Sequence, residues 1–112
     1  MCLFLLLASV SLGSAQEVEG TWSLSVDIGG AGGGDATLVL QQREDALTGS
    51  YTGALGNHEL TGTVLEGDIQ FQFTVDQVGQ IIYLGRLVGE QIEGRCAYGS
   101  LGSGTFVAIR SE

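Results

Sequence analysis

Hydrophobic and polar side chains alternate along most of the chain after residue 18. In residues 69–75 the odd positions are Ile69, Phe71, Phe73 and Val75, and Gln or Thr fills the even positions between them. This period of two is typical of a β-strand with one buried and one solvated face. The pattern as a whole predicts eight strands, at residues 18–28, 36–42, 47–53, 58–64, 69–75, 81–88, 91–98 and 105–110.

Short turns rich in glycine join these strands, and no stretch shows a helical period. Residues 54–57 and 66–68 carry Gly where a tight hairpin needs a positive φ, and residues 29–34 and 99–104 are expected to form longer glycine-rich connections. The pattern predicts an all-β fold, an eight-stranded antiparallel up-and-down barrel, because closing the sheet removes both of its edges. Mid-strand glycines at positions 49, 62, 85 and 94 would let the strands bend.

The first 15 residues have the composition of a signal peptide. They are apolar and end in small residues, with Gly13 and Ala15 at the −3 and −1 positions of a cleavage site before Gln16. The segment is shorter than the roughly 20 residues of a membrane-spanning helix. We therefore expect a signal peptide at residues 1–15, a single barrel domain at residues 16–112, and a secreted or periplasmic protein that has no membrane association once the signal is removed.

The charge of the chain argues against two classes of binding partner. Thirteen acidic residues stand against four arginines and no lysine, and the net charge is −9. Such a surface repels phosphate backbones and anionic lipid, which argues against nucleic-acid and membrane partners. Removal of Cys2 with the signal peptide would leave Cys96 without a disulfide partner, and its parity with Ile92 and Tyr98 predicts a small buried side chain.

Few residues could carry catalysis or bind a metal. His58 is the single histidine, Cys96 is isolated, and Asp27, Glu59 and Glu93 all fall on the outward parity of their strands. We therefore assign no catalytic residue, no metal site and no cofactor. A cyclase or isomerase that shapes a reactive substrate needs few catalytic groups, so the sequence leaves that minor alternative open.

The inward positions are unusually aromatic, which makes the barrel interior the main candidate site. Eight-stranded barrels are just wide enough either to fill with side chains or to hold one small ligand. One hypothesis is therefore a barrel that binds a small apolar or amphipathic molecule in its lumen. The candidate lumen residues are Trp22, Tyr51, His58, Phe71, Phe73 and Tyr98, and Phe106 shares their parity.

The second hypothesis is a filled barrel that acts as a structural or interaction module. Both faces of residues 81–88 are apolar, which is typical of a strand that is covered on both sides. A homo-oligomer formed through this strand is the corresponding partner prediction. The interface candidates are Ile81, Tyr83, Leu84 and Leu87.

Several motifs resemble known families. Gly20-Thr21-Trp22, the LTGSY run of residues 47–51, the LTG run of residues 60–62 and the FQFTV run of residues 71–75 together resemble the avidin and streptavidin barrel, and the expected fold is avidin- or lipocalin-like. That resemblance implies that Tyr51 contacts a ligand. The tryptophans that box biotin in that family are missing, since Asp76 and Gln77 follow residues 71–75. The short hairpins and the GSGTF run of residues 102–106 resemble more closely the short glycine-rich β modules of secreted bacterial proteins, which are sometimes attached to amidohydrolases.

Overall fold

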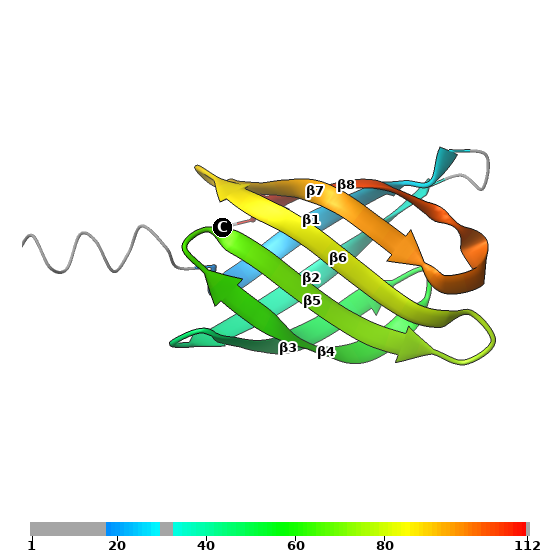
Figure 1. The fold of residues 1–112 in the computed structure, drawn as a ribbon, viewed down its shortest axis with the longest axis horizontal. Coiled ribbons are helices and arrows are strands. Elements are labelled where there is room, and N and C mark those ends of the chain that lie inside the picture. Colours follow the sequence, from blue (N-terminus) through cyan, green and yellow to red (C-terminus); the bar gives the residue numbers. More distant parts are fainter. Residues whose placement is uncertain (1–17, 30–32, 112) are drawn as a thin grey trace, which may run out of the picture.

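The computed structural model describes residues 18–29 and 33–111, which form a closed, all-β barrel (Figure 1). Eight antiparallel strands follow one another around the barrel in chain order, and the last strand pairs with the first. The predicted eight-stranded up-and-down barrel is confirmed. The predicted signal peptide at residues 1–15 lies outside the described residues.

The strands are β1 (Gly20–Asp27), β2 (Gly33–Arg43), β3 (Ala46–Gly53), β4 (Gly56–Leu65), β5 (Asp68–Val75), β6 (Gly79–Val88), β7 (Gln91–Tyr98) and β8 (Ser103–Arg110), with a short 3₁₀ turn η2 (Gly99–Leu101) before β8.

Most apolar residues of the alternating pattern are buried and the polar residues between them are exposed or half-buried, as expected. In β5, Ile69, Phe71 and Phe73 are buried, whereas Asp68 and Thr74 are exposed. Burying one face of every strand removes most of the apolar surface from water, which is the main favourable term in folding. The buried core has members from all eight strands, and it includes Trp22, Leu38, Leu47, Leu60, Phe71, Tyr83, Ile92 and Phe106.

Mid-strand glycines allow the sheet to close, as the sequence predicts. A Cβ atom at Gly62 would lie 1.8 Å from the carbonyl oxygen of Gln70, and one at Gly94 would lie 2.0 Å from the carbonyl oxygen of Leu84. No side chain fits at such distances. The neighbouring backbone can approach closely only because these positions lack a Cβ, and this approach bends the strands around the barrel axis.

Most strand limits lie within two residues of those predicted, and the largest difference is at the start of β2. Strand β2 begins at Gly33 instead of residue 36, because Gly33 and Gly34 pair with Asp27 and Val26 of β1. Residues 30–32 of the predicted connection lie outside the described residues. Strand β1 begins at Gly20 instead of residue 18, and Gly20 has a φ of 137°, a backbone conformation that favours glycine.

Strand β6 corrects the interface prediction. Ile81 and Tyr83 are fully buried inside the barrel, so their assignment to a subunit interface is wrong. Leu87 is half-buried and packs against the core. Only Leu84 lies on the outer face, 51% exposed, and its cross-strand neighbours Gln70 and Arg95 are polar. Isolated exposed apolar side chains are common on protein surfaces. A homo-oligomer through this strand stays a prediction that rests on Leu84.

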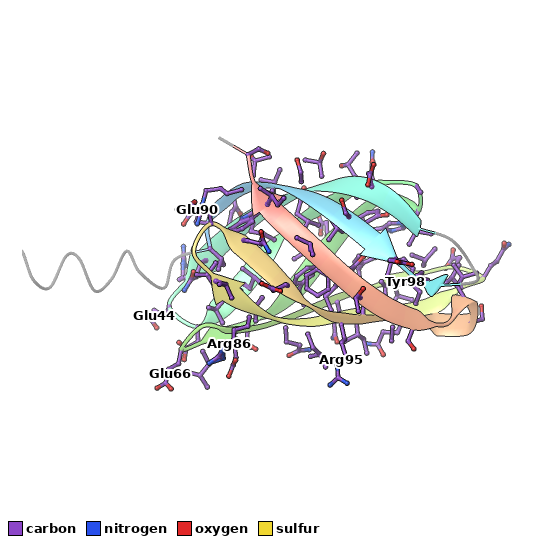
Figure 2. The ribbon with its side chains drawn as sticks, turned by 90° about the horizontal axis from the view of Figure 1, so that it is seen from above. Glu44, Glu66, Arg86, Glu90, Arg95 and Tyr98 are labelled. Carbon is purple, nitrogen blue, oxygen red and sulfur yellow. The ribbon has the colours of Figure 1, made fainter. Side chains whose placement is uncertain are left out.

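The barrel has two different ends. The closed end carries the β2–β3, β4–β5 and β6–β7 turns together with the last residues of β8, and the pocket end carries the β3–β4 and β5–β6 turns and η2. Figure 2 shows Glu44, Glu66 and Glu90 at the closed end and Tyr98 near the pocket end. These three acidic side chains of the hairpin turns therefore lie away from Tyr98.

Candidate ligand-binding site

Aromatic rings fill the middle of the barrel. The ring of Phe71 stacks on that of Tyr83, with 4.6 Å between centroids, and Phe106 meets Tyr83 edge to face at 5.1 Å. Toward the pocket end the rings of Tyr51 and Phe73 lie 4.7 Å apart. Such pairs add a directional contribution to the burial of apolar surface. The central lumen is thus packed with side chains and leaves no channel through the described barrel.

The closed end is sealed by Trp22 and the residues that cover it. The indole Nε1 of Trp22 donates to the carbonyl oxygen of Val18 at 2.9 Å, and the backbone N–H of Val18 donates to Gln42 Oε1 at 2.9 Å. The guanidinium of Arg110 lies over the Trp22 ring, 4.4 Å from its centroid, and Arg110 Nε donates to Glu90 at 2.6 Å. A stacked guanidinium covers an aromatic face well. Among the described residues, Val18 and Arg110 thus cover Trp22 at this end.

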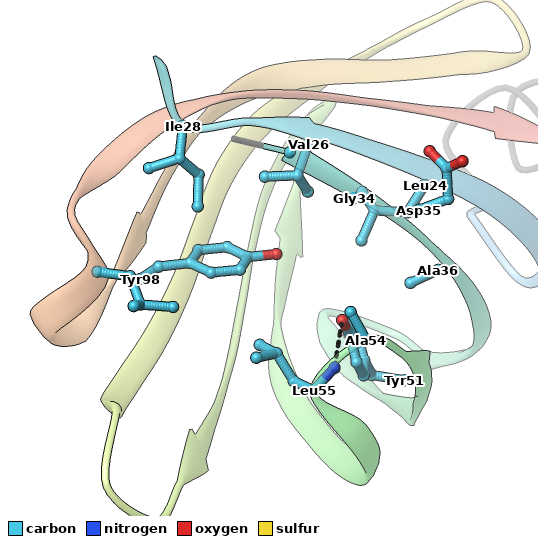
Figure 3. Close-up of a pocket in the computed structure, with 12 residues that line it drawn as sticks. Leu24, Val26, Ile28, Gly34, Asp35, Ala36, Tyr51, Ala54, Leu55 and Tyr98 are labelled. Atoms are coloured by element: carbon cyan, nitrogen blue, oxygen red, sulfur yellow. Dashed lines mark hydrogen bonds between the residues drawn. The ribbon is translucent and has the colours of Figure 1, made fainter. Parts of the chain in front are cut away.

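A cavity of about 150 Å³ lies at the pocket end (Figure 3). Its walls are mainly apolar, and the phenols of Tyr51 and Tyr98 supply polar atoms. Asp35 and Leu101 also line the cavity and are both exposed, so that it reaches solvent at the rim. The main apolar lining residues are Leu24, Val26, Ile28, Leu55 and Leu101.

The cavity exists because the inward side chains of β1 and β2 become smaller along the barrel. Trp22 is paired with Leu38 near the closed end, Leu24 is paired with Ala36, and Val26 is paired with Gly34 at the pocket end. A Cβ atom at Gly34 would find its nearest neighbour, the Cβ of Ala54, only at 4.0 Å. The missing side-chain volume therefore leaves a space that the neighbouring strands do not fill.

Two side chains hold the β3–β4 hairpin at the cavity wall. The Tyr51 hydroxyl accepts a hydrogen bond from the backbone N–H of Leu55 at 3.4 Å. His58 Nε2 donates to the backbone carbonyl of Leu55 at 2.6 Å, and the His58 ring stacks on Phe73 at 5.1 Å. Both peptide groups of Leu55 are thereby fixed, which positions its side chain against the cavity.

A pair of phenols joins the cavity to the core. The hydroxyls of Tyr83 and Tyr98 are hydrogen-bonded to each other, and their rings meet edge to face with 5.8 Å between centroids. Tyr83 is fully buried, whereas Tyr98 lines the cavity and is 6% exposed. A polar group therefore lies on the wall of a mainly apolar cavity.

The interior groups whose pKa is shifted are three tyrosines and one cysteine, and all of them stay neutral near pH 7. Burial raises the pKa of Tyr98 to about 12, although the hydrogen bond from Tyr83 opposes this increase. Burial also raises the pKa of Tyr83, and its bond to Tyr98 raises it further. Burial raises the pKa of Tyr51 and of the Cys96 thiol in the same way, against smaller opposing effects of backbone hydrogen bonds. The phenols thus act as neutral hydrogen-bonding groups.

The structure divides the predicted lumen residues into two groups. All of them point inward, but only Tyr51 and Tyr98 line the cavity. Trp22 seals the opposite end, Phe71 and Phe73 fill the core, and His58 supports the hairpin. Phe106, which shares their parity, is also buried in the core.

Several cavity residues were not among the candidates. Leu24, Val26 and Ile28 share the inward parity of Trp22, and this signal could have found them. Tyr83 was assigned to a surface because both faces of its strand are apolar, yet it forms the core side of the phenol pair. Leu55 carries no sequence signal, since it lies in a turn.

Within residues 18–29 and 33–111, no group of three or more His, Cys, Asp or Glu side chains could hold a metal ion. Over the same residues, no helix is long and apolar enough to span a bilayer. Cys96 is a free, buried cysteine, as its parity predicts.

Comparison with protein-family models gives no match for this chain, and comparison with curated proteins gives none either.

Proposed function

We propose that this protein is a small ligand-binding barrel that holds one neutral, mainly apolar molecule in the cavity at the pocket end. The observation that carries the proposal is the contrast between the aromatic rings packed in the middle of the lumen and the space of about 150 Å³ at the pocket end. An apolar cavity of that size stays dry in another protein and binds benzene. The ligand, or the part of it that enters, is therefore about the size of a substituted benzene ring.

The cavity walls define the chemistry of this ligand. Among the described residues no Lys or Arg lines the cavity, and the exposed carboxylate of Asp35 lies at its rim. A charged group moved into such a site would lose its hydration without gaining a partner of opposite charge. Burial of an uncharged ring against Leu24, Val26 and Ile28 is favourable because it removes apolar surface from water.

The resemblance to avidin-like barrels supports the same location. The motif match implies a ligand contact for Tyr51, and Tyr51 lies on the cavity wall. The missing tryptophans argue for a different and smaller ligand than biotin. The signal-peptide pattern of residues 1–15 supports a secreted or periplasmic carrier, and the mass of the protein purified from its own host tests this part, since cleavage before Gln16 gives a defined mass.

Isothermal titration calorimetry with α-methylstyrene tests the binding proposal. We expect saturable one-to-one binding to the wild type, and we expect the variant Gly34→Leu to lose it, because the new side chain projects into the cavity without meeting backbone. Thr37→Leu is the matched control, since Thr37 lies on the same strand but on its exposed outer face. Absence of binding to the wild type, or equal binding to Gly34→Leu, would refute the proposal.

A further inference from the structure

The Tyr98 hydroxyl is one of two buried phenol hydroxyls on the cavity wall. Tyr98 is 6% exposed, and in Figure 3 its ring extends across the cavity. Within the described residues, the single hydrogen-bond partner of this hydroxyl is the hydroxyl of Tyr83. A phenol has one proton to donate and can also accept. Which of the two hydroxyls donates therefore decides what Tyr98 offers to a ligand.

The surroundings of Tyr83 decide the direction of this bond. Tyr83 is fully buried against Phe71 and Phe106, which have no side-chain polar atoms. If Tyr98 donated to Tyr83, the Tyr83 proton would have no further hydrogen-bond partner among the described residues, which is costly. If Tyr83 donates, its proton is satisfied and the Tyr98 proton remains for the cavity.

We infer that Tyr98 presents one hydrogen-bond donor to the cavity and that the ligand carries an uncharged acceptor oxygen that meets it. The ligand class is then a neutral, mainly apolar ketone, aldehyde or ester. Tyr98 is the specificity-determining residue, and Tyr83 is a positioning residue that acts through it. This inference rests on the proposed function, because it names the chemistry of a molecule in the same cavity.

The Tyr51 hydroxyl is the competing donor. It accepts the Leu55 N–H, and its own proton has no acceptor among the described residues. It lies beside the hairpin backbone in Figure 3, whereas the Tyr98 ring reaches into the cavity. A test must therefore separate the two phenols.

Two probes of the same shape isolate the hydrogen bond. Acetophenone has a carbonyl oxygen where α-methylstyrene has a methylene group, so their hydration differs but their shape does not. Affinities of both are measured by calorimetry for the wild type and for Tyr98→Phe, Tyr83→Phe and Tyr51→Phe. Because the hydration of the two probes differs, the ratio of their affinities does not by itself report the hydrogen bond. The change in that ratio when a tyrosine is mutated does report it.

We expect Tyr98→Phe to weaken acetophenone binding by about fivefold and to leave α-methylstyrene binding unchanged, the usual size of one neutral hydrogen bond. We expect Tyr83→Phe to weaken acetophenone binding by about twofold, because the donated bond polarises the Tyr98 O–H group. A general packing defect would weaken both probes alike. Failure of α-methylstyrene to bind the wild type refutes the proposed function, whereas failure of acetophenone alone, or equal effects of Tyr98→Phe on the two probes, refutes only this inference.

The carbonyl stretch of bound acetophenone gives a second readout that does not depend on affinity. A hydrogen bond to the carbonyl lowers this frequency relative to acetophenone in hexane. We expect the lowered frequency in the wild type and its return toward the hexane value in Tyr98→Phe. A hexane-like frequency in the wild type, or a return confined to Tyr51→Phe, would overturn the assignment to Tyr98.

Discussion

The two ends of the barrel are built from the same alternating strands, but inward side chains fill the closed end and leave a cavity at the pocket end. At the closed end, Trp22 pairs with Leu38 and is covered by Arg110 and Val18. At the pocket end, the equivalent pair is Val26 and Gly34, and a cavity remains. The comparison teaches that side-chain volume along two neighbouring strands decides where a ligand could enter.

The ends also differ in charge. The closed end carries the acidic turn residues Glu44, Glu66 and Glu90, and its arginines form ion pairs, Arg86 with Asp68 and Arg110 with Glu90. Apart from the rim carboxylate of Asp35, the cavity at the pocket end is lined by neutral phenols, glycines and aliphatic side chains.

The largest expected effect comes from removing the side chain that seals the closed end. Trp22→Ala should lower the free energy of unfolding by about 3 to 5 kcal/mol, because it deletes a fully buried ring and leaves a void. The matched change at the pocket end, Val26→Ala, should cost only about 1 kcal/mol, because Val26 is half-buried beside existing space. Urea denaturation measures both, and equal losses would contradict the contrast between the ends.

High pH should destabilise the protein through the phenols of the middle and pocket end. Folding raises the pKa of Tyr98 from an ordinary 10.0 to about 12, so the unfolded chain loses this proton first. The stabilisation is fully present below pH 10 and is lost as the pH rises toward 12, by up to about 1.4 kcal/mol per pH unit for each such phenol. Urea midpoints at pH 9 to 12 measure this loss, which should be smaller in Tyr98→Phe. A midpoint that is constant over this range would contradict the prediction.

Charge on the ligand should be penalised at the pocket end. Benzoate has nearly the shape of acetophenone, and we expect it to bind at least about tenfold more weakly at pH 7, because the cavity provides no cationic partner among the described residues. Competition calorimetry measures the difference. Benzoate binding as tight as that of acetophenone would show that a cation approaches the site and would remove the neutral character proposed for it.

The smallest expected effect concerns a turn at the closed end. Glu66 has a φ of 53° in the β4–β5 turn, a backbone conformation that Asn tolerates better. Glu66→Asn should raise the free energy of unfolding by about 0.5 kcal/mol and leave binding at the pocket end unchanged. Glu59→Asn, on an exposed strand position, is the control and should give no increase. A change in probe affinity in Glu66→Asn would mean that the two ends are coupled.

The fold could be predicted from the sequence because the alternation of apolar and polar residues is a signal within each strand. Each strand shows its own inward face, and the glycines at positions 62 and 94 mark bends that the neighbouring backbone requires. Strand β6 was the exception, because Leu84 and Val88 are apolar although they face water. Periodicity cannot identify the buried face of such a strand, and Tyr83 was therefore assigned to the wrong side.

The candidate site could be predicted from the sequence only in part. Parity placed Tyr51 and Tyr98 inside the barrel, and both line the cavity. Parity could not show that Trp22 seals one end while Gly34 leaves space at the other, because this depends on cross-strand register. The contact between Tyr83 and Tyr98 joins neighbouring strands near the middle of the barrel and also depends on that register.

Methyl NMR during titration with α-methylstyrene tests the central claim most directly, because it reports both ends of the barrel in one spectrum. The account predicts saturable shifts for the methyl groups of Leu24, Val26, Ile28 and Leu55 at the pocket end. It predicts no shifts for those of Leu47, Val64 and Ile69, which are buried toward the closed end. Shifts centred on the closed end, or none at any methyl group, would contradict it.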